Sequence, residues 1–175
     1  MTPLTDPRHD TISMVGVTPG AHTLTIVPAC NDHSMMMSKA VDVAFTYAGP
    51  YLPMPTAAPS TGAPAISITG PAAGSTVRAG STFDMTAAVS NFTLCGDCFG
   101  KANVDGVGHW HIFIDAPVMS NMRTMAGDLT QTVSLKGVAP GWHTFWAVLV
   151  DNSHMPLMND PAGMAAVYLY VAPAR

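Results

Sequence analysis

The distribution of apolar and polar residues along the chain predicts short strands joined by turns. From residue 65 onward, apolar positions recur with a period of two in successive short segments, the spacing of strands that bury one face. Turns rich in Gly and Pro separate these segments. We therefore expect strands at residues 65–69, 75–78, 83–89, 109–115, 128–135, 142–150 and 164–171. This number of short strands in one domain is typical of an immunoglobulin-like antiparallel sandwich.

One of these strands occurs twice, together with the loop that follows it. The segment GWHTFWAVLVDNSHMPLM, Gly141 to Met158, aligns without a gap with GAHTLTIVPACNDHSMMM, Gly20 to Met37, which lies 121 positions earlier. The preceding GVAP and GVTP also match. We expect further strands at residues 11–15, 22–27 and 41–47, but no counterpart of residues 65–115 precedes them. The N-terminal part is therefore interpreted as a partial second copy of the same unit.

These patterns divide the chain into three parts. Residues 1–48 form the partial repeat, residues 49–64 a Pro-rich extended linker, and residues 65–173 a complete immunoglobulin-like domain. A few isolated strands would leave an apolar face and open edges. The partial repeat therefore packs on the complete domain, is completed by another chain in a homo-oligomer or a larger assembly, or belongs to a longer protein.

Composition supports the all-β prediction and narrows the function. Hydrophobic residues make up 48% of the chain and charged residues 10%, with one Gln and no Glu, so common helix-forming residues are scarce. A net charge of −4 without a basic cluster gives no footprint for nucleic acid. No apolar run is long enough for a membrane span. The N-terminus lacks a signal-peptide pattern, so either export information was removed with a longer precursor or the protein is cytosolic. The Thr-, Ala- and Pro-rich composition favours a mature periplasmic or extracellular protein.

The string GHWHIFIDAP and the later GVAPGWHTFWAVLVDNSHMPL together resemble a known group of sequences. These are poorly characterised bacterial exported domains with a GHxH strand and a PG-x-H-T-L…(N/D)-x-H-x-P segment. The resemblance covers roughly residues 65–172 and implies an immunoglobulin-like sandwich, without implying an activity. The matching histidines in this sequence are His109, His111, His143 and His154.

The histidines fall into two settings. His109 and His111 point to the same face of a strand. His154 lies in a loop that can fold over that face, so the three histidines can converge on a metal ion. We expect His154 to face solvent beside methionines. The alternative is that they are surface residues or satisfy loop carbonyls. His143 and its counterpart His22 follow Pro-Gly on an apolar strand face. For these two we expect a structural role, anchoring the turn by hydrogen bonding.

Methionine is unusually abundant, with 13 residues in 175. Several follow a histidine in segments that look polar and turn-like, and another cluster spans residues 119–125, so core filling explains them poorly. Thioether sulfur selects Cu(I), and imidazole binds copper in either oxidation state. We therefore expect copper as the bound ion, with metal ligands drawn from His109, His111, His154, Met155, Met158, His33, Met35, Met36 and Met37.

The remaining candidate chemistry is weaker. Cys95 and Cys98 could form a local disulfide, a redox pair or half of a metal site, and Cys30 stands apart. Hydrolase and phosphate-loop motifs are absent, and no catalytic residue is assigned. The expected function is an exported protein that handles or stores copper as Cu(I) or Cu(II). The alternative is a structural or interaction module of a larger surface protein or assembly, without a metal role.

Overall fold

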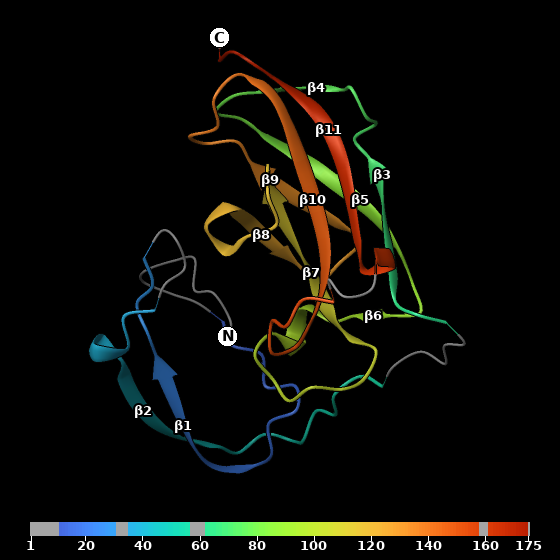
Figure 1. The fold of residues 1–175 in the computed structure, drawn as a ribbon. Helices are drawn as coiled ribbons and strands as arrows, with labels where there is room; N and C mark the ends of the chain where they lie inside the picture. The colour runs from blue at the N-terminus through green and yellow to red at the C-terminus, as the bar shows by residue number, and fades with distance from the viewer. Residues whose placement is uncertain (1–10, 31–34, 57–61, 158–160, 175) are drawn as a thin grey trace.

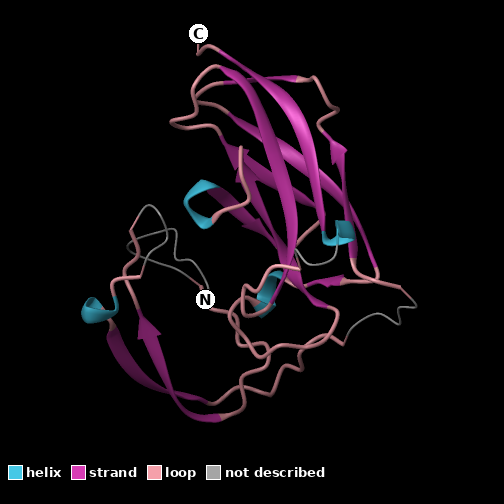
Figure 2. Ribbon diagram, viewed as in Figure 1, coloured by secondary structure: helices cyan, strands magenta, loops and turns pink. Residues whose placement is uncertain are grey.

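The structure, a computed structural model, describes residues 11–30, 35–56, 62–157 and 161–174. Within these residues the chain forms strands, loops and short 3-10 turns (Figure 2). The prediction of an all-β fold is confirmed. No helix in the described part of the chain is long and apolar enough to cross a membrane.

The larger part of the molecule is a sandwich of two β-sheets (Figure 1). The three-stranded sheet has the order β3-β5-β9 and consists of β3 (Ala65–Gly70), β5 (Thr82–Ser90) and β9 (Thr130–Ser134). The six-stranded sheet has the order β4-β11-β10-β7-β6, with β8 paired to β7 off this path. Its strands are β4 (Thr76–Arg78), β6 (Thr93–Leu94), β7 (Val107–Ile114), β8 (Met122–Ala126), β10 (Gly141–Asp151) and β11 (Met164–Ala172). This division of strands is that of an immunoglobulin-like sandwich.

The core lies between the two sheets, where alternate residues of each strand meet. The six-stranded sheet contributes the largest fully buried side chains, Trp110 and Phe145, and the three-stranded sheet contributes Met85. The indole Nε1–H of Trp110 donates to the carbonyl oxygen of Asp128 at 2.8 Å, so the polar end of this ring is satisfied. Because side chains alternate along β7, its remaining residues face away from the core.

The strand predictions fail at residues 11–15 and at β8, and the two-residue strand β6 was not predicted either. The predicted strand at residues 11–15 is reduced to a single parallel bridge between Val15 and Leu52. Conversely, Met122 and Met125 lie in strand β8 rather than in a polar turn. Strand β8 pairs with β7, and its register shifts at Ile112 and Phe113. A short strand with an irregular register has no clean alternation, which explains why the pattern was not recognised.

The N-terminal repeat forms a separate two-stranded sheet of β1 (Gly20–Ile26) and β2 (Val41–Tyr47). The register pairs His22 with Phe45, as His143 pairs with Leu169 between β10 and β11. In both copies Gly20 and Gly141 have a positive φ, 137° and 144°. The partial second copy predicted from the sequence is therefore confirmed as a hairpin.

The two copies also close their loops in the same way. The Met36 amide donates to the Pro28 carbonyl at 2.9 Å, and the Leu157 amide donates to the Leu149 carbonyl at 2.8 Å. Each donor and acceptor in the first pair lies 121 positions before its counterpart in the second. The 3-10 turn η1 (Met37–Lys39) follows this closure in the N-terminal copy.

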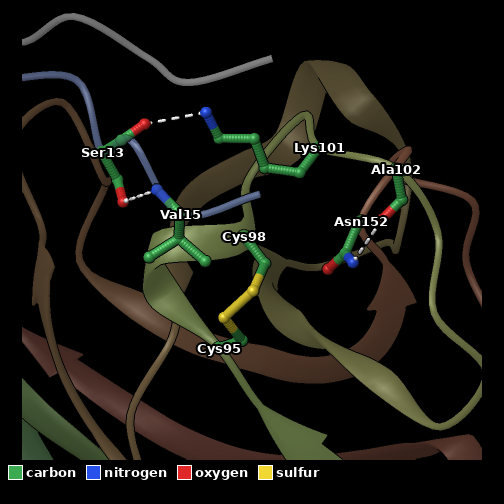
Figure 3. Close-up of a disulfide and its surroundings, with 7 residues drawn as sticks. All are labelled: Ser13, Val15, Cys95, Cys98, Lys101, Ala102 and Asn152. Atoms are coloured by element: carbon green, nitrogen blue, oxygen red, sulfur yellow. Dashed lines mark hydrogen bonds between the residues drawn. A yellow bond between two sulfur atoms is a disulfide. The ribbon is translucent and has the colours of Figure 1, made fainter. Parts of the chain in front are cut away.

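Residues that flank the hairpin pack against the sandwich at a disulfide (Figure 3). Cys95 and Cys98 are bonded, with their Cα atoms 5.3 Å apart. Val15 and Met54 pack against this pair, and the Lys101 ammonium donates to the Ser13 carbonyl at 2.7 Å. Both ends of the hairpin are thus tied to one loop of the complete domain.

Candidate metal centre

Strand β7 places two histidines on the face opposite the core. Trp110 and Ile112 enter the core, so His109 and His111 project from the other side of the sheet. Both rings are nevertheless buried, with 0% and 2% exposure, because loops cover this end of the sheet. A buried polar side chain needs a partner, and here the partners are other imidazoles.

The loop after β10 brings a third histidine over this pair. His154 has a φ of 66°, a left-handed conformation that non-glycine residues seldom adopt. The carboxylate of Asp151 holds the turn in place by accepting hydrogen bonds from the backbone amides of Ser153 and Met155, each at 2.9 Å. Unusual backbone conformations of this kind concentrate at functional sites.

A second loop braces the turn from the side. The side-chain Nδ2 of Asn103 donates to Asp151 Oδ2 at 2.9 Å, and the side-chain Oδ1 of Asn103 accepts from the Ser153 backbone amide at 3.0 Å. The Asn152 side chain donates to the Ala102 carbonyl at 3.0 Å (Figure 3). The turn that carries His154 is therefore fixed to the loop between the disulfide and β7.

The three imidazoles present one nitrogen each to a common point. His109 Nε2 lies 3.1 Å from His111 Nε2, and both atoms lie 3.2 Å from His154 Nδ1. A ring nitrogen carries either one in-plane hydrogen or one lone pair, so three mutual contacts cannot all be linear hydrogen bonds. Nitrogens bound to one tetrahedral metal ion at about 2.0–2.1 Å would be roughly 3.3 Å apart. The triangle therefore has the size of a three-histidine metal site.

The same burial keeps His109 neutral. Desolvation, with the neighbouring His111 and His154 as smaller causes, lowers the pKa of His109 to about 2. Its Nδ1 is buried and has no hydrogen-bond partner among the described residues. A neutral imidazole that cannot easily accept a proton retains a lone pair for a metal ion across the physiological pH range.

An aromatic ring closes one side of the triad. The Phe99 ring centroid lies 4.3 Å from that of His109, directly after the 3-10 turn η2 (Gly96–Cys98) that contains the disulfide. His154 is only partly buried, so the site faces solvent on the side where His154 lies. Sequence reasoning identified neither Phe99 nor the bracing Asn103, because neither belongs to a motif with recognisable spacing.

The predicted ligands are only partly brought together. His109, His111 and His154 converge; His154 contacts the pair and is partly buried, so it is only partly exposed to solvent, as expected for a loop residue. Met155 is 63% exposed. His33 and Met158 lie outside the described residues. The remaining predicted ligands are Met35, Met36 and Met37. They are exposed and belong to the N-terminal repeat, whereas His154 belongs to the complete domain.

The framework histidines behave as expected in both copies. His22 Nε2–H donates to the Thr18 carbonyl at 2.7 Å, and His143 Nε2–H donates to the Ala139 carbonyl at 3.0 Å. His143 Nδ1 also lies 3.0 Å from both carboxylate oxygens of Asp115. These two residues anchor the turn before each strand, whereas the metal-site geometry belongs to the other three.

Fold and site together define an all-β protein with an immunoglobulin-like sandwich and a buried three-histidine cluster. No protein-family model and no curated protein matches the chain. Among solved structures, the fibronectin(III)-like modules of Clostridium thermocellum CbhA are similar, with a TM-score of 0.39 and 14% sequence identity. The similarity covers 63% of this chain and 99% of that chain. Because this TM-score is low, the fold assignment rests on the strand order.

Proposed function

We propose that this protein binds a copper ion at His109, His111 and His154 and acts outside the cytoplasm in copper handling or storage. The observation that carries the proposal is the triangle of ring nitrogens with sides of 3.1–3.2 Å. Ring N–H groups can satisfy only part of this triangle, whereas a cation between the three nitrogens would use a lone pair from each of them. A bound metal ion supplies that cation and uses all three nitrogens.

The chemistry of the surroundings favours copper over a harder ion. Among the described residues, no carboxylate or thiol joins the three imidazoles, and a neutral nitrogen set in an apolar setting suits Cu(I) as well as Cu(II). Exposed thioethers at Met35, Met36 and Met37 offer additional soft donors on the surface. In this proposal they bind Cu(I) weakly, whereas the buried triad is the tight site.

Two features support a location in an oxidising compartment. The Cys95–Cys98 disulfide is a bond that persists in secreted and periplasmic proteins and is rare in the cytosol. The low content of charged residues, 10%, agrees with the composition of a mature exported protein. Copper ligation by imidazole and thioether also avoids thiols, which oxidise in such compartments.

The direct test is metal analysis of the full chain purified without a tag. We expect one tightly bound copper per chain after loading and dialysis, and a raised midpoint of thermal unfolding because the ion binds only the folded state. The His154→Ala variant should lose both effects. This substitution removes one corner of the triad but leaves β7 and the core unchanged.

The matched control is His22→Ala, which removes a histidine from the N-terminal hairpin and should retain one tight copper. Equal copper content and stabilisation in the parent and in His154→Ala would contradict the proposal. So would a parent protein that binds no copper at micromolar concentration. Binding of zinc with clear preference over copper would retain the site but overturn the assigned metal.

A second function is supported by a different observation. The hairpin leaves large apolar side chains exposed, including Ile26 at 38%, Val41 at 58% and Val43 at 43%. Within the described residues β1 pairs with β2 alone, so the other edge of β1 has no strand partner there. The equivalent edge of β10 pairs with β7. We propose that this face also contacts a further protein chain in an assembly. Light scattering coupled to size-exclusion chromatography should show self-association of the parent that is lost in a Val41→Thr, Val43→Thr variant.

A further inference from the structure

We propose that Met125 is the fourth ligand of the metal centre and makes it selective for Cu(I). This inference rests on the proposed function of the three histidines. It starts from the register between β7 and β8, in which Met125 is the Cα partner of His111. Residues directly opposite in an antiparallel pair project from the same face, with Cβ atoms about 4.5–5.5 Å apart.

The neighbouring residues confirm which face this is. Trp110 pairs with Ala126, and both are fully buried in the core between the sheets. Because side chains alternate along each strand, Met125 and His111 lie together on the opposite, loop-covered face. Met125 is partly buried, in keeping with a position at the edge of the site.

The other strand neighbours of the histidine pair offer no donor atom. On β10, Val150 is the partner of His109 and Val148 the partner of His111. On the β8 side, the residue after Ala126 is Gly127, where an added Cβ would lie 2.2 Å from the Gly96 Cα. That space is filled by the backbone of the disulfide loop. The thioether of Met125 is therefore the donor that the sheet places next to the triad.

The donor set determines the metal. Three imidazoles alone would serve zinc, cobalt or copper, whereas a thioether is a soft ligand that favours Cu(I). A neutral site of three imidazoles and one thioether would leave bound Cu(I) with its single positive charge in an apolar setting. A divalent ion there would carry twice the uncompensated charge at a greater desolvation cost.

The test replaces Met125 by Leu, which nearly preserves volume but removes the sulfur. Cu(I) affinity is measured anaerobically by competition with a chromophoric Cu(I) chelator, and Co(II) binding by its visible absorption. We expect Met125→Leu to weaken Cu(I) binding roughly tenfold or more, which corresponds to about 1.4 kcal/mol or more. Co(II) affinity should remain within about twofold, because Co(II) gains little from a thioether. Retained Co(II) binding also shows that the variant is folded.

The matched control is Met164→Leu. Met164 is the partner of Val148 on β11, on the same face of the sheet but separated from β7 by β10, roughly 10 Å away by strand spacing. Its Cu(I) affinity should equal that of the parent. X-ray absorption at the copper edge should show one sulfur neighbour in the parent and in Met164→Leu, and none in Met125→Leu.

The two proposals fail in different ways. If Met125→Leu binds Cu(I) as tightly as the parent and shows the same sulfur signal, Met125 is not a ligand, while copper binding by the triad stands. An equal loss of Cu(I) and Co(II) affinity would also overturn the assignment, because it would indicate a structural role for Met125. If the parent binds neither ion, the proposed function fails and the fourth ligand with it.

Discussion

The N-terminal hairpin and the hairpin of β10 and β11 share their local structure but differ in what surrounds them. Both are preceded by a left-handed glycine, Gly16 at a φ of 74° and Gly137 at 75°, and both place a histidine over the carbonyl four residues earlier. The short-range hydrogen bonds are thus encoded within each copy. They form whether or not the rest of a sandwich is present.

Burial, in contrast, depends on the strands that only one copy possesses. Val167 is 7% exposed in the sandwich, whereas Val43, at the equivalent pairing position, is 43% exposed. Strand β7 supplies the edge partner of β10 and also the His109–His111 pair. Within the described residues, the N-terminal copy has no counterparts of strands β3 to β9, so it has neither the core nor the histidine pair of β7, although its turn and loop sequences are kept.

The largest predicted difference between the copies concerns the core. Phe145 is fully buried, and its counterpart Leu24 is only partly buried. We expect Phe145→Ala to reduce the free energy of unfolding by about 3–5 kcal/mol. Leu24→Ala should cost less than about 1 kcal/mol, because little of its surface leaves water on folding. Urea unfolding of the full chain followed by far-UV circular dichroism, which reports on the strands of both copies, measures both losses. Equal losses would show that the hairpin has a core partner.

Much of the fold was predictable because it depends on local alternation. Strands such as β10 and β11 have clear apolar periods and Gly-containing turns before them. The gapless repeat also allowed the β1–β2 hairpin to be predicted. Strand β8 was missed because its pairing with β7 is a tertiary contact with an irregular register. No alternation within Met122–Ala126 reveals such a contact.

The three histidines of the candidate site were predictable from the sequence, but the residues that support them were not. The His109-x-His111 spacing places both rings on one face, and a loop histidine was expected to join them. The inward turn of His154 depends on Asp151 and Asn103, which lie far apart in the chain. Methionine abundance pointed to soft-metal chemistry, but sequence alone gave no means of separating exposed methionines from Met125, whose position follows from strand register.

The buried histidine of the candidate site should also make the stability of the complete copy depend on pH. The pKa of His109 is lowered to about 2 by burial, whereas an unfolded histidine has a pKa near 6.5. Between these values the unfolded chain binds the extra proton, so stability of the metal-free protein falls as pH decreases below about 6.5. The slope should approach about 1.4 kcal/mol per pH unit from this residue.

Urea unfolding of the metal-free parent at pH 7.0, 6.0 and 5.0 measures this slope. The His109→Phe variant, which retains a ring in the buried position, should show a shallower dependence over the same range. His22→Ala serves as the control in the N-terminal copy and should leave the slope unchanged. A parent with the same stability at all three pH values would contradict the burial argument.

The framework histidines should differ by a smaller amount. His143 contacts both the Ala139 carbonyl and the Asp115 carboxylate, whereas His22 contacts the Thr18 carbonyl in a sheet whose described strands include no equivalent of β7. We expect His143→Ala to cost about 1–2 kcal/mol of unfolding free energy, and His22→Ala less than about 0.5 kcal/mol. Copper content should stay at the parental level in both variants, since neither residue belongs to the triad. Loss of copper from His143→Ala at a temperature where it is folded would assign that residue to the site.

The smallest effect on stability is expected from the exposed methionines, and it separates the two copies most sharply in metal binding. Replacing Met35, Met36 and Met37 together by Ser should change the unfolding free energy by no more than about 0.5 kcal/mol, because all three are exposed. The tight copper at the triad should remain, since its ligands come from β7 and the loop after β10. In a Cu(I) titration, the variant should instead lack the weak binding that the parent shows after its tight site is saturated. If the tight copper disappeared with these methionines, the N-terminal copy would be part of the metal centre, and the division between a complete binding copy and a partial one would be wrong.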